Sequence, residues 1–170
     1  MRILKANQLI FCLLAFFLLS SCTNNKNEVI LDHQTKYLLP NGLISNNVTQ
    51  LDVNFYNSLI NNKNETSLIL YKVLKGNNFQ MYLGMGFETS MEKIKTIIRS
   101  NPNSTLISEQ TFGADSFTIY QKTEAGQYIS HYFKELKSGN KYLFTAIGNN
   151  TIINESFTSN FIESQITYKK

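Results

Sequence analysis

The sequence predicts an α+β fold, in which an antiparallel sheet packs with about three helices, and two observations lead to this prediction. Apolar residues recur with helical spacing in three separate segments: 48–60, a segment that begins at Thr89, and 154–166. Between the second and the third of these, four stretches rich in β-formers follow one another, with only short glycine-containing turns between them. Strands joined by such turns run antiparallel, so we expect the four to form a C-terminal meander.

The first expected helix covers residues 48–60. Leu51, Phe55 and Leu59 repeat there every four residues, which predicts a buried stripe along one side of the helix. Residues 46–47 are both asparagine, and we expect them to cap the first turn. The segment is therefore predicted to be an amphipathic helix that packs against the sheet.

A hairpin and a second helix are expected next. Residues 67–75 are dense in β-formers, residues 79–85 alternate between apolar and other side chains, and residues 76–78 between them have turn composition. The second helix is expected to begin at Thr89, which fits a capping box with Glu92. Its buried stripe is expected to consist of four large apolar residues: Met91, Ile94, Ile97 and Ile98.

The meander and the third helix complete the expected domain. The meander strands are expected at 105–112, 116–123, 127–137 and 141–147. The third helix, 154–166, is expected to be capped by Asn154. The side chains expected to face inward from it are Phe157, Phe161 and Ile162. Helices packed on an antiparallel sheet make an α+β sandwich.

The N-terminal segment has the features of an export signal. Arg2 and Lys5 form a positive region, and an apolar run follows from Leu9 to Leu19. That run is far shorter than the ~20 residues that a membrane-spanning helix requires. Two small residues then precede a cysteine, Cys22, after which the chain turns abruptly polar.

The sequence Leu19-Ser20-Ser21-Cys22 resembles the lipobox of bacterial lipoproteins. The resemblance implies that the thiol of Cys22 takes a diacylglyceryl group and that the signal peptide, 1–21, is cleaved before it. An uncleaved anchor or an ordinary secretory signal is the alternative. Because the other cysteine lies within the signal, the mature chain would contain no disulfide.

Three segments are therefore expected: the signal peptide 1–21, a lipidated flexible tether 22–36, and a single α+β domain 37–170. Two acyl chains are sufficient for stable membrane attachment, so we expect the lipid to be what holds the protein at the membrane. The expected location is a bacterial cell envelope, facing the periplasm or the surface. In the enterobacterial sorting pattern an Asp after the cysteine favours the inner membrane, so Thr23 favours the outer membrane.

The order of the expected elements carries a second resemblance. A strand at Tyr37–Leu39 before the turn 40–42, the middle helix, the meander and a closing helix with Phe161, Ile162 and Ser164 resemble the photosystem II extrinsic (PsbP-like) superfamily. The resemblance covers most of 37–168. It implies the fold and an accessory role, and it supplies no catalytic residues. A cystatin-like cone or a nuclear-transport-factor-like cone is the rival fold.

No catalytic or metal-binding constellation is found in the sequence, and no cofactor is expected. His33 lies in the expected tether and His131 lies in the middle of a strand, where we expect it to be half-exposed. A metal site at His131 would need Glu109 or Glu135 to converge on it. The glycines at 84–86 lack the lysine and the βαβ context of a phosphate loop, so we expect a turn there.

The aromatic residues of the meander are the remaining candidates for a site. The tyrosines that could form an aromatic face are Tyr120, Tyr128, Tyr132 and Tyr142. An envelope location argues against nucleic acid as the partner, and cross-strand aromatic residues often only stabilise sheets. If one sheet face stays uncovered, these tyrosines would instead mark a protein-binding or glycan-binding surface.

Three classes of function remain open. The favoured one is a non-catalytic envelope module that binds a protein partner, as an assembly factor, an accessory subunit or an immunity protein. The second is a carrier of a small ligand or a lipid, which requires an apolar cavity between sheet and helix. The third is a hydrolase or transferase with an unrecognised site. The sequence leaves the identity of the partner and the oligomeric state open.

Overall fold

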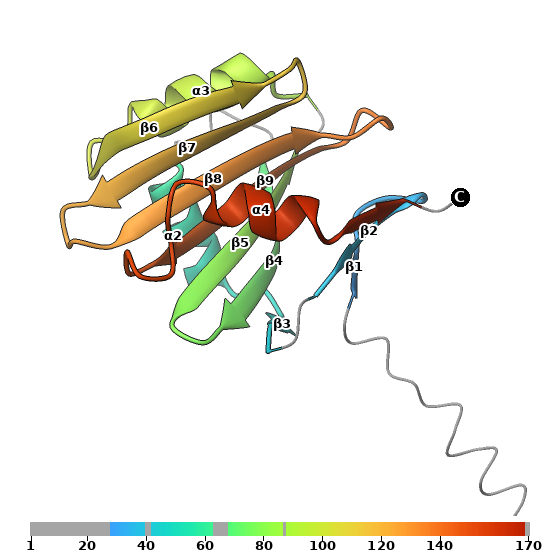
Figure 1. The fold of residues 1–170 in the computed structure, drawn as a ribbon, viewed down its shortest axis with the longest axis horizontal. Helices are drawn as coiled ribbons and strands as arrows, with labels where there is room; N and C mark the ends of the chain where they lie inside the picture. The colour runs from blue at the N-terminus through green and yellow to red at the C-terminus, as the bar shows by residue number, and fades with distance from the viewer. Residues whose placement is uncertain (1–27, 40–41, 63–67, 87, 169–170) are drawn as a thin grey trace, which may run out of the picture.

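The computed structural model describes residues 28–39, 42–62, 68–86 and 88–168 (Figure 1). Its elements in chain order are β1 (Glu28–Ile30), β2 (Thr35–Leu38), β3 (Ile44–Asn46), α2 (Gln50–Leu59), β4 (Ile69–Gly76), β5 (Phe79–Gly86), α3 (Met91–Arg99), β6 (Ser104–Phe112), β7 (Ser116–Thr123), β8 (Tyr128–Glu135), β9 (Lys141–Gly148), α4 (Phe157–Glu163) and β10 (Ile166–Tyr168). The expected order of helices, hairpin and meander is confirmed.

One large antiparallel sheet organises this part of the chain. Its strand order is β3-β4-β5-β9-β8-β7-β6, so the four expected meander strands, β6 to β9, lie side by side. The α+β class is therefore confirmed. The sheet is larger than the meander because the hairpin β4–β5 joins it, with β5 paired to β9 from Phe79 to Gly86.

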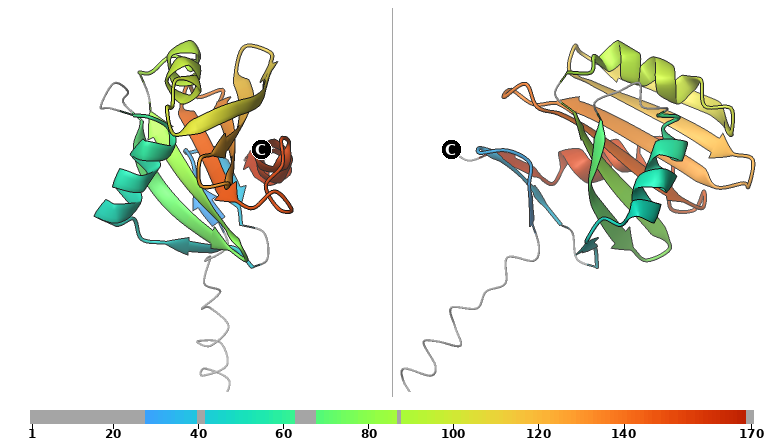
Figure 2. Two further views of the ribbon diagram at one scale, coloured as in Figure 1. Left: turned by 90° about the vertical axis from the view of Figure 1, so that its left-hand side faces the viewer. Right: turned by 180° about the vertical axis from the view of Figure 1, so that it is seen from behind.

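The two faces of this sheet are covered by different elements. Helices α2 and α3 lie on one face, and α4 lies on the other, over β8 and β9 (Figure 2). The core on the α2–α3 face includes Tyr56, Ile94, Ile98, Phe117, Phe133 and Leu143. The core on the α4 face includes Tyr37, Met81, Leu83, Tyr132, Phe144 and Ile162. Strand alternation supplies both cores, because successive side chains point to opposite faces.

Helix α2 lies within the expected range, but its buried side differs from the expected stripe. Thr49 is the N-cap, in a reciprocal capping box, rather than the asparagine pair before it. Tyr56 and Leu59 are buried, whereas Leu51 is 79% exposed and Phe55 is 41% exposed. The expected stripe was therefore wrong at two of its three positions, because the helix turns Tyr56 toward the sheet.

Helix α3 confirms the expected stripe and corrects the expected cap. Ser90 has extended backbone and its hydroxyl accepts a hydrogen bond from the backbone N–H of Lys93 at 3.2 Å. The cap is therefore Ser90 and not Thr89, which stands one residue too early for this bond. Three of the residues expected inside are buried: Ile94, Ile97 and Ile98.

Helix α4 is shorter than the expected segment 154–166. It spans Phe157–Glu163, and the side chain of Asn154 accepts a hydrogen bond from the backbone N–H of Ser156 at 3.2 Å before the helix starts. Asn154 therefore shapes the turn into the helix instead of capping it. After the helix, β10 continues into a second sheet.

A small second sheet, β1-β2-β10, packs on the α4 face and corrects the expected tether. Strands β1 and β10 pair with opposite edges of β2. Val29 and Leu31 are buried in the core, and the hydroxyl of Tyr142 donates a hydrogen bond to the carbonyl oxygen of Leu31. The expected tether, 22–36, was therefore too long, since its part from Glu28 onward belongs to the folded domain.

The expected lipid-attachment residue, Cys22, and the lipobox residues Leu19, Ser20 and Ser21 lie outside the described residues, as does the whole expected signal peptide, 1–21. Among the residues that are described, none of the helices has the length and apolar character to span a bilayer.

Candidate functional site

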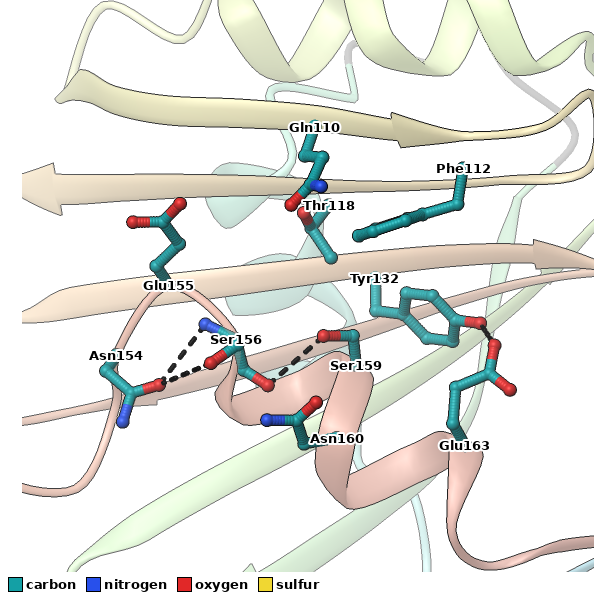
Figure 3. Close-up of a pocket in the computed structure, with 10 residues that line it drawn as sticks. All are labelled: Gln110, Phe112, Thr118, Tyr132, Asn154, Glu155, Ser156, Ser159, Asn160 and Glu163. Carbon is teal, nitrogen blue, oxygen red and sulfur yellow. Dashed lines mark hydrogen bonds between the residues drawn. The ribbon is translucent and has the colours of Figure 1, made fainter.

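An open groove lies between α4 and the outer strands of the large sheet, and we call it the α4 groove (Figure 3). Its volume is about 620 Å³. Helix α4 lies over β8 and β9 and leaves the same face of the edge strand β6 uncovered (Figures 1 and 2), whereas Thr118 and Tyr120 on this face of β7 are buried. The residues that line the groove are Gln110, Phe112, Thr118, Tyr132, Asn154, Glu155, Ser156, Ser159, Asn160 and Glu163.

The helix side of the groove is a polar stripe. Ser159, Asn160 and Glu163 lie three, four and seven residues after Ser156, which places all four on one side of α4. The hydroxyl of Ser159 donates to the carbonyl oxygen of Ser156 at 3.1 Å. The side chain of Asn160, an exposed residue, also lines the groove (Figure 3).

The sheet side of the groove is built by three neighbouring strands. Gln110 on β6 lies opposite Thr118 on β7, which lies opposite Tyr132 on β8. Residues directly opposite one another on adjacent strands point to the same face, so these three side chains form a row across the floor. Phe112, 39% exposed, adds an aromatic ring two residues after Gln110 on the same face.

One end of the groove is held by hydrogen bonds and ion pairs. The hydroxyl of Tyr132 donates to the carboxylate of Glu163. Burial, together with that carboxylate, raises the pKa of Tyr132, so the phenol remains a donor at any physiological pH. Lys134 Nζ lies 2.9 Å from Asp115 Oδ2 and 3.9 Å from Glu163 Oε1. Its hydrogen bond lowers the pKa of Asp115.

The chemistry of the groove suits binding. Its lining offers amides, hydroxyls and two aromatic rings, with two carboxylates, Glu155 and Glu163, at its opposite ends (Figure 3). Such a surface can accept hydrogen bonds from polar groups and can attract a positive charge. Among the described residues, no group of three or more His, Cys, Asp or Glu side chains is placed to hold a metal ion.

Strand β6 borders the groove and forms one edge of the large sheet. It is nine residues long, and in the described sheet it pairs with β7 alone. Leu106 is 43% exposed and Ile107 is 49% exposed, at a register shift between Leu106 and Ser108. An edge strand carries backbone N–H and C=O groups that can pair with another extended chain.

Two further cavities are described, and they differ in character from the groove. One, of about 790 Å³, lies between the small sheet and the large one and is bordered by residues 30–34, Tyr71, Met85, Ser138 and Asn140. The other, of about 280 Å³, lies between α2 and the turn that joins β7 and β8. Both carry polar side chains in their walls, and neither is the apolar cavity between sheet and helix that a lipid carrier requires.

The four tyrosines expected to form an aromatic face do not form an exposed one. Tyr120, Tyr132 and Tyr142 are buried, and Tyr128 is half-buried and stacks on Tyr120 with ring centroids 5.6 Å apart. The hydroxyl of Tyr120 donates to the carbonyl oxygen of Ile153 at 3.0 Å. They share one face, but α4, the segment before it and the small sheet cover that face. Only Tyr132 also lines the groove.

His131 is fully buried, which corrects the expected half-exposed position. Its Nδ1 lies 3.0 Å from Thr145 Oγ1 and its Nε2 lies 3.2 Å from Gln121 Oε1. The Gln121 amide in turn donates to the carbonyl oxygen of Ile98 at 3.0 Å. Burial lowers the pKa of His131 to about 3. Glu109, one of the two carboxylates considered as its partners, instead pairs with an arginine of α3.

The glycines at 84–86 also differ from expectation, because they lie inside β5 and not in a turn. A methyl group at Gly84 would overlap with the phenol of Tyr56, and one at Gly86 would come within 3.1 Å of Leu68. Their role is to let α2 and the segment after it approach the strand closely.

Sequence reasoning missed most of the groove. Of its lining residues, Tyr132 was singled out for another reason and Asn154 as a helix cap. The polar stripe of Ser156, Ser159 and Asn160 was the available signal, since it lies opposite the apolar side of the expected helix. Gln110 on β6 and Thr118 on β7 could not be recognised as groove residues, because a polar side chain in a predicted strand normally indicates only that this position faces solvent.

Comparisons with known proteins support the fold. A scan against models of protein families finds none that matches the chain, and a search of curated proteins finds no match. Among solved structures, the solution structure of cyanobacterial PsbP (CyanoP) from Synechocystis sp. PCC 6803 is similar, with a TM-score of 0.52 and 9% identity, over 87% of this chain and 96% of that chain. At this identity the likeness concerns the fold alone, and the expected PsbP-like fold is confirmed at that level.

Proposed function

We propose that this chain is a lipid-anchored accessory protein of a bacterial cell envelope, without catalytic activity, that binds an extended segment of a protein partner. The observation that carries the proposal is the position of the α4 groove beside the open edge of β6. The PsbP-like fold is consistent with this role, because the superfamily resemblance implies an accessory protein and supplies no catalytic residues.

The partner segment would add to the edge of the large sheet. Its backbone would pair with β6, and its side chains would reach over Phe112 and Gln110 into the groove. Main-chain hydrogen bonds would give affinity, and the groove would select the side chains. Because Glu155 and Glu163 line the groove, we expect the segment to carry lysine or arginine.

Site-specific photo-crosslinking tests the binding site. A photoreactive phenylalanine analogue replaces Phe112 or Ser159 in the groove and, as a matched control, Lys93 on the exposed side of α3. Illumination of cells should give the same discrete crosslinked protein at 112 and 159 and none at 93. Equal products at all three positions, or a discrete product only at 93, would contradict the proposed site.

The anchor is tested separately. Labelled palmitate should be incorporated into the parent protein and not into a Cys22→Ala variant, and the variant should leave the membrane fraction. A parent without label, together with a variant that still sediments with membranes, would overturn the anchor while leaving the groove untouched. Separation of the inner from the outer membrane then checks the outer-membrane location that Thr23 favours.

A further inference from the structure

One end of the molecule brings together the start of β1, strand β3, the first turn of α2 and the turn between β4 and β5. In Figure 1 and in both views of Figure 2 these parts lie low in the picture, whereas α3 lies at the opposite end. We call this the β3 end.

The β3 end exposes apolar side chains. Leu51 on α2 is 79% exposed and Ile44 on β3 is 64% exposed. Leu38, 39% exposed, lies opposite Glu28 at the start of β1. Single exposed apolar residues are ordinary, but Leu51, Ile44 and Leu38 all belong to elements that lie at or beside the β3 end.

The distance to the proposed lipid is short. Five residues, 23–27, separate Cys22 from Glu28, the first described residue. A fully extended chain advances about 3.5 Å per residue, so Glu28 lies within about 20 Å of the lipidated cysteine. An anchor of this length keeps the β3 end close to the bilayer and makes contact between them effectively intramolecular.

A basic residue is also present at this end. Lys75 is exposed, lies opposite Ile44 in the β3–β4 pairing, and contributes to the lowered pKa of Asp52, whose main cause is the hydrogen bond from Thr49. A lysine beside apolar side chains suits the boundary between lipid headgroups and acyl chains, where anionic headgroups attract it.

We propose that the β3 end lies on the lipid surface, with Ile44 and Leu51 entering the headgroup region and the α4 groove left free for its partner. The inference rests on the lipid anchor of the proposed function. It adds an orientation, in which α2 and β3 face the bilayer while α3 points away from it.

Fluorescence from single labelled cysteines tests this orientation. The lipidated protein is reconstituted in vesicles of phosphatidylethanolamine and phosphatidylglycerol, with an environment-sensitive dye on a cysteine that replaces Leu51, Ile44 or, as the control, Lys93. The only cysteine of the expected mature chain carries the lipid, so the introduced thiol is the one that reacts. Lipids that carry a quencher should reduce emission about twofold or more at 51 and 44, and leave position 93 unchanged.

In the first experiment the dye replaces one of the apolar side chains under test. A second set of variants therefore keeps the dye at a separate position and changes the apolar residues independently. The dye is moved to Asn77, in the turn at the β3 end, and its quenching is compared between the parent and two double variants. Leu51→Ser with Ile44→Ser should abolish most of the quenching. The control pair Leu106→Ser with Ile107→Ser replaces the same two residue types on β6, where they are 43% and 49% exposed, and should leave the quenching unchanged.

Each outcome decides the inference. Quenching at 51, 44 and 77 but not at 93 supports it. Equal quenching at 93, or none at any position, overturns it even though palmitate is incorporated at Cys22. If palmitate is not incorporated, the lipid anchor itself is overturned. Failure of the anchor can therefore be distinguished from failure of the proposed orientation.

Discussion

The two faces of the large sheet differ in how they are covered and in where their polar side chains lie. On the α2–α3 face, a buried network pairs several polar groups inside the protein: His131 contacts Thr145 and Gln121, and Gln121 reaches the end of α3, whereas the buried hydroxyl of Tyr56 has no hydrogen-bond partner among the described residues. On the α4 face, polar groups on α4 and the outer strands turn instead toward an open groove. The first face is closed by two helices and the second is covered only in part.

Because of this difference, we expect the α2–α3 face to contribute mainly to stability and the α4 groove to contribute mainly to binding. A buried network of paired polar groups resists change, because any lost partner leaves a buried group unpaired. An open face tolerates change, because water replaces a lost partner. We therefore expect substitutions on the α2–α3 face to lower the free energy of unfolding and substitutions of exposed groove residues, such as Phe112 and Asn160, to leave it nearly unchanged.

The largest expected effect is at the stacked pair Phe117 and Phe133, whose ring centroids lie 5.2 Å apart at an interplanar angle of 6°. Phe117 is fully buried, so Phe117→Ala should lower the free energy of unfolding by about 3–5 kcal/mol in urea titrations. Phe112→Ala, at the groove, is the control and should cost less than about 1 kcal/mol. Equal losses would show that the two faces do not differ.

The second largest effect is expected from acid, which should destabilise the α2–α3 face. The folded pKa of His131, about 3, lies below its ordinary value of 6.5, so only the unfolded chain takes up this proton between those values. Stability should fall by roughly 1.4 kcal/mol per pH unit below 6.5. Below about pH 4.5, Glu109 and Asp115, whose pKa values are lowered by their partners, should add to the loss.

Unfolding measured between pH 7 and pH 4.5 checks this expectation. His131→Gln removes the titrating group, so its stability should change much less over that range, whatever its value at pH 7. The same slope in both proteins would mean that His131 is not responsible for the acid sensitivity.

A close approach on the same face should be disrupted by a single methyl group. Gly84→Ala places a Cβ against the phenolic oxygen of Tyr56 and within 2.7 Å of its ring carbon Cζ. We expect a loss of about 1–3 kcal/mol in the free energy of unfolding. Adding Tyr56→Phe to this variant should recover part of the loss, because it removes the oxygen but not the ring. A double variant whose losses simply add would exclude the proposed overlap.

The smallest expected difference in stability concerns one charged carboxylate from each face, Glu109 and Glu163. Glu109, with a side chain 16% exposed, pairs with Arg99 and with the buried Lys95, whereas Glu163 has a side chain 55% exposed. Glu109→Gln should cost about 1 kcal/mol and Glu163→Gln about 0.5 kcal/mol or less. Urea titrations at low and high salt measure both, and a larger loss for Glu163→Gln would reverse the comparison.

The sequence was most informative where local patterns and packing agree. The stripe of Ile94, Ile97 and Ile98 and the order of the meander followed from periodicity and turn composition. The burial of Tyr56 in place of Leu51 could not be predicted, because it depends on the space left by Gly84 on a strand far along the chain. The α4 groove was missed for a similar reason, since it exists only where a short helix leaves the edge strand β6 uncovered.

The small sheet has a consequence for the order in which the domain can be completed. Strand β2 lies between β1, from the beginning of the described residues, and β10, which ends at Tyr168. The sheet therefore joins segments that are far apart in the sequence, and it can form only after residues 166–168 have been synthesised. A chain that stopped before β10 would leave one edge of β2 without its neighbour.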